Sequence, residues 1–241
     1  MRRPLLLSVA VVCAYGAAGA AWAQGSFGGS LDVTSDYIYH GLSQSDGDAA
    51  LQGDIHYRGE SSAATAENFI GLWGSTVGRY ATGGNYELNA YAGRTFLINA
   101  DSSATVKYVH YAYPDSHGTP HYDYDELSGT WAYEDRLFLS VAWTPDTGNY
   151  SERAVALCCR LLSYSAAVHQ SLGRAFTLSA ALGYDAMRGG YGYAYWNAGI
   201  AYAIGAFQLD VSYFGLQPRV VYLYGDTLAG NHWVGTVVWR F

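Results

Sequence analysis

The sequence of 241 residues predicts an all-β protein, an antiparallel up-and-down transmembrane β-barrel. Three observations predict this class. Apolar and polar residues alternate along most of the chain, as in strands with two different faces. Charged residues are only 14% of the chain, against about 25% in ordinary soluble domains. After residue 23 no stretch is long and apolar enough for a membrane helix, so any membrane span must consist of strands.

The first residues are typical of a secretory signal peptide. Arg2 and Arg3 precede an apolar run, and Ala21-Trp22-Ala23 forms a small-residue cleavage site. We therefore expect a signal peptide at 1–23 that is cleaved after Ala23, a β-barrel at 24–241, and a location in the bacterial outer membrane. The adjacent pair Cys158-Cys159 follows much later, and its redox state and role stay open.

About twelve strands are expected, with ten to fourteen possible, because predicted boundaries carry errors of about two to four residues. The expected strands lie at about 27–41, 51–58, 67–78, 84–97, 102–113, 121–133, 136–145, 161–172, 175–185, 191–203, 206–215 and 231–241. An even number returns both termini to the periplasmic side. Connections alternate roughly between short periplasmic turns, such as Glu134-Asp135, and longer extracellular loops, such as Ser43–Asp48 and 145–160.

The last strand has a distinct pattern. Trp233, Val237, Trp239 and Phe241 share one face, and the intervening positions carry most of the polar groups. A final Phe on such a strand resembles the closing strand of outer-membrane barrels, where it takes part in recognition by the insertion machinery. The resemblance implies that Phe241 is an insertion signal, with the barrel-insertion machinery and outer-membrane lipid as partners.

Composition separates a barrel from a soluble sandwich. A sandwich would carry abundant Lys, Glu and Arg on its wet faces, whereas here the second face holds Ser, Thr, Asn, Asp, Gly and Tyr. Those residues suit a hydrated lumen, and the aromatic-rich face suits lipid. The net charge of −7 disfavours nucleic acid as a partner, since phosphate contact needs a basic surface.

Alternation places a set of polar residues on the inner face as candidates for lining a pore. They are Asp32, Asp36, His40, Asp54, His56, Arg58, Glu87, Asn89, Lys107, Asp210, His232 and Arg240. Carboxylates in a narrow lumen favour cations. In the alternative interpretation these charges pair with one another and fill a barrel that does not conduct.

Two weaker patterns each have a structural alternative. His169-Gln170-Ser171 places His and Ser on one face and resembles the His-x-Ser of lipid A deacylases, but Leu172 stands where that family has Asn. A structural histidine is the preferred interpretation, and no enzyme activity, catalytic residue or cofactor is expected. His117 and His121, near Asp115, Asp123 and Asp125, could bind a divalent metal, although a solvated acidic loop is preferred over a metal site.

One stretch carries a family resemblance. Residues 35–47, S-D-Y-I-Y-H-G-L-S-Q-S-D-G, are followed by A-L-Q-G-D-I-H-Y at 50–57 and by G-L-W-G-S at 71–75. These motifs resemble those of the TorF-like family, exported proteobacterial proteins regarded as outer-membrane porins. The resemblance implies an outer-membrane barrel with pore activity and names no substrate. His40 stands where the family usually has Arg, which would make a charge there pH-dependent.

The sequence as a whole predicts a channel, or porin, for passive diffusion of small polar or cationic solutes. A non-conducting barrel that serves as an envelope scaffold or surface-binding protein is the second hypothesis, and a lipid-modifying enzyme is the third. The sequence leaves the solute, the lumen radius and the oligomeric state open.

Overall fold

A computed structural model of the chain describes residues 25–60, 65–116, 122–145, 161–187, 191–220, 224–225 and 227–241. The predicted signal peptide at 1–23, the histidine pair at 117 and 121 and the cysteines at 158 and 159 lie outside these residues. Among the described residues, no helix is long and apolar enough to cross a membrane.

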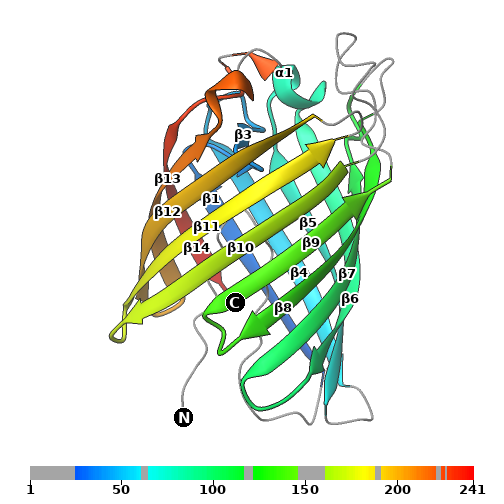
Figure 1. Cartoon of the computed structure of the whole chain (residues 1–241), viewed down its shortest axis with the longest axis vertical. Coiled ribbons are helices and arrows are strands. Elements are labelled where there is room, and N and C mark those ends of the chain that lie inside the picture. Colours follow the sequence, from blue (N-terminus) through cyan, green and yellow to red (C-terminus); the bar gives the residue numbers. More distant parts are fainter. Residues whose placement is uncertain are drawn as a thin grey trace.

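Twelve of the described strands form one closed antiparallel barrel (Figure 1). They are β1 (Ser26–Thr34), β4 (Ala50–Glu60), β5 (Ala66–Thr76), β6 (Tyr86–Leu97), β7 (Ser102–Ala112), β8 (Tyr124–Tyr133), β9 (Leu137–Thr144), β10 (Leu161–Leu172), β11 (Phe176–Met187), β12 (Gly192–Ile204), β13 (Phe207–Leu216) and β14 (His232–Arg240). Each strand pairs with its neighbour in the chain, and β14 returns to β1. The predicted fold class and up-and-down order are therefore confirmed.

Tight turns join several of these strands at one end of the barrel. Glu134 and Asp135 connect β8 to β9 with positive φ angles of 51° and 53°, and Gly173 and Gly205 turn the chain after β10 and β12. These are the positions where the sequence predicts short connections. A left-handed backbone there lets two long strands reverse within a few residues.

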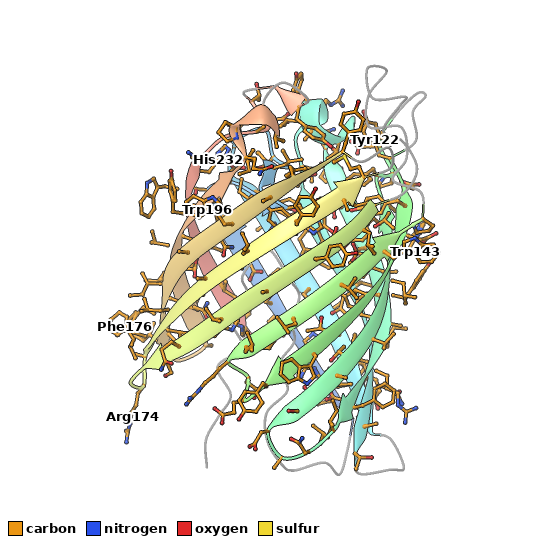
Figure 2. The ribbon with its side chains drawn as sticks, in the orientation of Figure 1. Tyr122, Trp143, Arg174, Phe176, Trp196 and His232 are labelled. Atoms are coloured by element: carbon orange, nitrogen blue, oxygen red, sulfur yellow. The ribbon has the colours of Figure 1, made fainter. Side chains whose placement is uncertain are left out.

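The two faces of the wall differ as the alternation predicts. On β9, Leu139, Val141 and Trp143 are exposed, whereas Phe138 and Thr144 are buried. Trp143, Phe176 and Trp196 project outward from the wall (Figure 2). An exposed apolar band that continues around all twelve strands is much larger than the apolar patches of soluble monomers. It is the lipid-facing surface of a transmembrane barrel.

The barrel closes between β1 and β14. Leu31 lies opposite Trp239 and Val33 opposite Val237 in the antiparallel register. Beyond the strand, Gly29 and Phe241 exchange two backbone hydrogen bonds, with N···O distances of 3.0 and 3.1 Å. Gly29 is required at this point, because a Cβ there would lie 2.8 Å from the Phe241 ring. Closure pairs the backbone polar groups that an open sheet would leave bare in lipid.

The structure corrects the first hairpin. The strand expected at 27–41 ends at Thr34, and the extracellular loop expected at Ser43–Asp48 is part of a longer segment that folds into the barrel. Residues 35–49, here called the inner loop, contain a two-stranded turn of β2 (Ile38–Tyr39) and β3 (Leu42–Ser43). His40 and Gly41 form its tip with positive φ angles of 50° and 81°.

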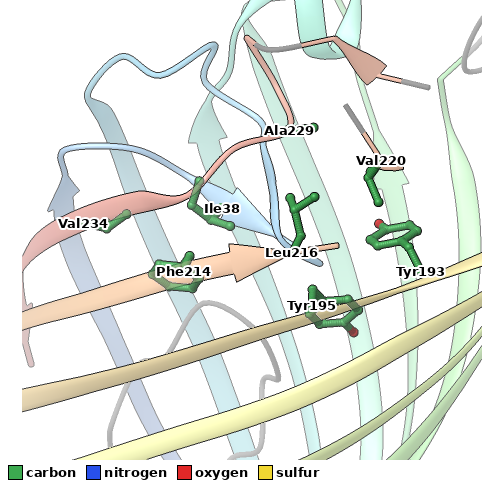
Figure 3. Close-up of a cluster of buried hydrophobic side chains, with 8 residues drawn as sticks. All are labelled: Ile38, Tyr193, Tyr195, Phe214, Leu216, Val220, Ala229 and Val234. Carbon is green, nitrogen blue, oxygen red and sulfur yellow. The ribbon is translucent and has the colours of Figure 1, made fainter. Parts of the chain in front are cut away.

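The inner loop packs inside the barrel, although Tyr37 and Tyr39 continue the spacing of the lipid-facing residues of β1. Ile38, between these two tyrosines, is the most deeply buried residue of the three. Its side chain, 1% exposed, packs in a cluster with seven residues of the surrounding wall and loops (Figure 3). These are Tyr193, Tyr195, Phe214, Leu216, Val220, Ala229 and Val234. The alternating pattern in the inner loop thus reflects contacts inside the barrel and not a continuation of the lipid-facing wall.

The remaining described helices lie near the inner loop. Helix α1 (Arg79–Thr82) is one turn long, and Asp46 of the inner loop accepts hydrogen bonds from the backbone N–H groups of Tyr80 and Ala81 at 3.0 and 2.9 Å. The 3-10 helix η3 (Pro218–Val220) follows β13, and Val220 packs in the cluster around Ile38.

The lipid-facing assignment predicts a position-dependent cost for a charge. Val211→Arg, on the outer face in the middle of β13, should destabilise the folded barrel by about 2–4 kcal/mol, the range measured for Arg at the midplane of such barrels. Ser165→Arg, on the inner face of β10, is the matched control and should cost less than half as much. Reversible unfolding in guanidinium from lipid vesicles measures both, and equal costs would contradict the assignment of faces.

Candidate channel interior

All twelve residues that the sequence predicts on the inner face point into the barrel, and none is exposed on the lipid side. Asp32, Asp36, His40, Asp54, Glu87, Asn89 and Asp210 are buried, and His56, Arg58, Lys107, His232 and Arg240 are part-exposed. Asp36 and His40 reach this position from the inner loop and not from a strand. That they line a conducting pore stays a prediction.

The tip of the inner loop is anchored to the far side of the barrel. The His40 Nδ1 atom lies 2.9 Å from the Asp185 carboxylate of β11, and both side chains are buried. The His40 ring stacks on Tyr195 of β12, with 5.0 Å between ring centroids and 12° between planes. Tyr195 in turn lies over Gly183, where a Cβ would collide with its ring. His40 is thus held both by the pair with Asp185 and by stacking on the Tyr195 ring.

The same loop also reaches the opposite flank. The Tyr39 hydroxyl donates to the Glu126 carboxylate of β8 at 3.2 Å and lies 3.3 Å from the Tyr111 hydroxyl of β7. Tyr37 packs against Trp73 of β5 and lies within 3.5 Å of a carboxylate oxygen of Glu87. The inner loop therefore spans the interior between β5–β8 on one side and β11–β12 on the other.

Asp36 holds the base of the inner loop. One of its carboxylate oxygens accepts hydrogen bonds from the hydroxyls of Ser43 and Ser45 at 2.7 and 3.0 Å. The other oxygen lies 3.0 Å from the His232 Nδ1 atom on β14. The carboxylate thus ties both halves of the loop to the strand that closes the barrel, which explains why Asp and Ser occur together in this stretch.

Several inner charges of β4 and β5 have partners, as the non-conducting alternative expects. The Asp54 carboxylate lies 2.6 Å from His56 Nδ1 and accepts a hydrogen bond of 2.6 Å from the Tyr91 hydroxyl. Arg58 faces Glu67 at 3.8 Å. The wall that carries these residues is a packed polar layer.

Two carboxylates of the same wall are less fully paired. Asp32 accepts a 3.3 Å hydrogen bond from Ser30, and Asp210 accepts one of 2.6 Å from Ser212, but each keeps one buried oxygen without a protein partner. Both border a cavity of about 40 Å³, which has room for one or two waters.

Three inner carboxylates escaped the sequence prediction, namely Glu67, Glu126 and Asp185, which are all at most 6% exposed. Alternation within the predicted strands does place them on the inner face. Leu127 and Tyr184, which are next to Glu126 and Asp185 in the sequence, lie on the outer face. Alternation cannot predict that Glu126 and Asp185 pair with the inner loop. The sequence predicts the residues of that loop as the end of a strand and an extracellular loop.

The enzyme-like pattern is not assembled as a catalytic pair. The Ser171 hydroxyl donates to the Gly173 carbonyl at 2.8 Å, and the His169 ring packs against Phe138 with 5.0 Å between centroids. In the described part of the chain, no group of three or more His, Cys, Asp or Glu residues is placed to hold a metal ion.

Comparison with known proteins places the chain in a family. Residues 18–238 match the model of a family described as "bacterial protein of unknown function (Gcw_chp)". The chain belongs to this family. No curated protein matches it. The more specific likeness of residues 35–75 to the TorF-like family stays a prediction.

Solved structures share the fold of this Gcw_chp protein at low sequence identity. It is similar to the KdgM porin in complex with oligogalacturonate (8% identity, TM-score 0.52, covering 89% of this chain and 98% of that one). It is also similar to the NanC porin (12%, 0.50, 90% and 100%). A third similar structure comes from work on the in-meso crystallization of membrane proteins (11%, 0.56, 89% and 83%). The likeness shows a porin-type barrel and no more.

The anchoring of His40 predicts a pH-dependent stability. Burial lowers the pKa of His40, but the carboxylates of Asp185 and Glu126 outweigh it, so the net pKa lies above the ordinary value of 6.5. A raised folded-state pKa adds stability that is fully present below pH 6.5 and is lost as pH rises through the raised value. His40→Gln should therefore cost about 1.5–3 kcal/mol, as for a hydrogen bond to a charged group, at pH 5.5, and less at pH 9.

His110→Gln is the matched control. His110 pairs with Asp125 at 2.8 Å, but both side chains are about half exposed on the outer face. Such a pair contributes less than about 1 kcal/mol. Unfolding free energies of the wild type and both variants from pH 5.5 to 9 measure the difference. An effect of His40→Gln that does not shrink as pH rises would show that the ring acts through packing alone.

Proposed function

We propose that this protein is an outer-membrane channel through which small polar or cationic solutes diffuse passively. Residues 1–23 would direct export and be cleaved after Ala23, and Phe241 would serve recognition by the insertion machinery. The TorF-like motifs and the porin-type fold support this proposal. Selectivity would come from lumen radius and from the charge of the lining, without a cofactor or a chemical step.

The observation that carries the proposal is that acidic side chains outnumber basic ones in the interior of the barrel. Eight carboxylate side chains are buried among the described residues, namely Asp32, Asp36, Asp54, Glu67, Glu87, Glu126, Asp185 and Asp210. Three inner side chains carry a permanent positive charge: Arg58, Lys107 and Arg240. An acidic excess attracts cations into a narrow hydrated space and repels anions.

The contrast with a similar structure narrows the solute class. The KdgM porin is described in complex with oligogalacturonate, which is a polyanion. A polyanion would meet an excess of carboxylates over cationic side chains in the interior of the present barrel, which repels negative charge. We therefore place acidic oligosaccharides outside the proposed solute class and keep neutral and cationic solutes within it.

A non-conducting barrel is the second candidate, and one observation favours it. The inner loop crosses the interior, with anchors on β8 at Glu126 and on β11 at Asp185. A segment held on both sides narrows the passage, and a scaffold protein would gain rigidity from the same contacts. Conduction and its absence are therefore the two outcomes that decide between the candidates.

Single-channel recording in planar bilayers tests the proposal directly. Under a salt gradient we expect stable unitary steps and a reversal potential shifted toward the cation equilibrium value. Asp54→Asn, which removes one buried carboxylate charge, should weaken that shift, because pore selectivity follows the fixed charge of the lining.

Asp101→Asn is the matched control. Asp101 is an exposed residue in the turn between β6 and β7, so the same change in charge outside the interior should leave the reversal potential unchanged. A folded and inserted barrel that never conducts would exclude a channel and leave the scaffold function. Anion preference of the wild type would contradict the assignment of charge.

A further inference from the structure

A small cavity lies inside the barrel, beside the strands that close it. It has a volume of about 40 Å³ and is here called the seam cavity. Asp32 of β1 and Asp210 of β13 border it, and so does Thr236 of β14, the strand between them. In the antiparallel register Asp32 lies opposite Val238, and Asp210 lies opposite Thr236. The two carboxylates therefore reach the seam cavity from both sides of the last strand.

Each of these two carboxylates has one oxygen without a protein partner. Ser30 donates to one oxygen of Asp32, and Ser212 donates to one oxygen of Asp210. The other oxygens, Oδ1 of Asp32 and Oδ2 of Asp210, are buried and accept no hydrogen bond from the protein. Both side chains are more than nine-tenths buried, at 6% and 7% exposed. A buried carboxylate is unfavourable unless something pairs with it, so the seam cavity requires a polar or positive occupant.

The charge around the seam cavity favours a cation as that occupant. Arg240 attracts Asp32, whereas Asp210 has no salt-bridge partner among the residues that the structure describes. Asp36 also borders the cavity and lies 3.0 Å from His232. Three carboxylates thus face two basic side chains, and the net charge is negative even when His232 is protonated. Such a site attracts a cation and repels an anion.

The other groups around the seam cavity suit an ion that keeps part of its water. Thr236 and Gln52 border the cavity and supply neutral oxygen ligands. A volume of about 40 Å³ holds one or two waters, so an ion with one retained water fills it. Ile38, Phe214 and Val234, which lie together in Figure 3, also line the cavity. These apolar side chains lower the local dielectric constant, which strengthens the attraction between the carboxylates and an ion.

The ligand set differs from that of a structural metal centre. In the described part of the chain, no three His, Cys, Asp or Glu residues surround a common point for a metal ion. Ca²⁺ takes about six to eight oxygen ligands, and Mg²⁺ needs a near-ideal octahedral shell, which is more than two carboxylates and two neutral groups supply. A monovalent cation has weaker demands on ligand number and charge.

We propose that the seam cavity binds a partly hydrated monovalent metal cation between Asp32 and Asp210. The ion pairs with the free oxygen of each carboxylate, directly or through its retained water. It thereby links β1 to β13 across β14 and stabilises the closure of the barrel. The site does not depend on conduction, so the inference goes beyond the proposed channel function.

Anomalous diffraction from rubidium tests the position of the ion in the wild-type barrel. Rubidium has the charge of sodium and potassium and scatters X-rays anomalously, which neither of those ions does strongly. Crystals soaked in rubidium chloride should show an anomalous peak in the seam cavity, between Asp32 and Asp210. A seam cavity without a peak would overturn the proposal, and no variant has to fold for this measurement.

Unfolding in urea from lipid vesicles tests the ligands. The salt is potassium chloride or N-methylglucamine chloride, both at about 0.15 M so that screening is equal. The wild type should be more stable in potassium, because an ion that binds only the folded state stabilises it, and N-methylglucamine is too large for the cavity. Asp32→Asn and Asp210→Asn should each raise the potassium concentration for half of this effect at least about tenfold, since each removes a charged ligand.

Glu67→Gln is the matched control. Glu67 is also a buried carboxylate, at 5% exposed, but it faces Arg58 and does not border the seam cavity. This variant should keep the potassium dependence of the wild type, and an equal loss there would overturn the site. Asp32→Asn and Asp210→Asn variants that are stabilised equally in both salts would also overturn it, because the two carboxyl groups would then be hydrated or protonated and bind no ion.

These outcomes are distinct from those of the channel function. A rubidium peak in a barrel that never conducts would exclude the channel and keep the cation site. Cation-selective conductance in a barrel whose seam cavity holds no rubidium would keep the channel and exclude the site.

Discussion

The hydrogen bonds between β1 and β14 are the constraint on which the rest of the structure depends. A sheet in lipid must leave no backbone polar group unpaired, and only closure achieves this. Once closed, the barrel has an outside and an inside, and a strand side chain must belong to one or the other. Val33 and Val237 meet on the outside of the seam, while Thr34 and Thr236 join through a 2.9 Å hydrogen bond on the inside.

Closure then gives the inner loop a defined role. Its anchors at Asp185 and Glu126 come from strands far away around the barrel, so the loop is held by the wall only because the wall is continuous. Asp36 links the loop back to His232 on β14, beside the seam itself. The Asp36 carboxylate thus connects the inner loop to the strand that closes the barrel. The loop also occupies part of the interior, since Tyr37 packs against Trp73.

Alternation of polarity was enough to predict the fold, because an antiparallel wall between lipid and water imposes it on every strand. The strand order, the short turns and the inner face of Asp54, His56 and Arg58 all follow from that rule. The rule failed at residues 35–41, where Tyr37 and Tyr39 keep the spacing of lipid-facing residues but lie inside the barrel. The TorF-like motif falls on this segment, but the partners of its histidine, Asp185 and Tyr195, come from strands about 150 residues away in the chain. No local pattern encodes such distant contacts.

The charged residues of the interior are easier to predict from the sequence than its small polar residues. Aspartate and histidine stand out in a sequence with few charges, yet Asp54 and Asp36 are largely engaged in structural pairs. Serine and threonine do not indicate a site in the sequence, because they occur throughout such chains. In a closed barrel, however, the width left for a solute depends on where side chains are absent. The buried carboxylates therefore set the electrostatic potential of the interior, whereas its free width depends on all the inner side chains and on the inner loop.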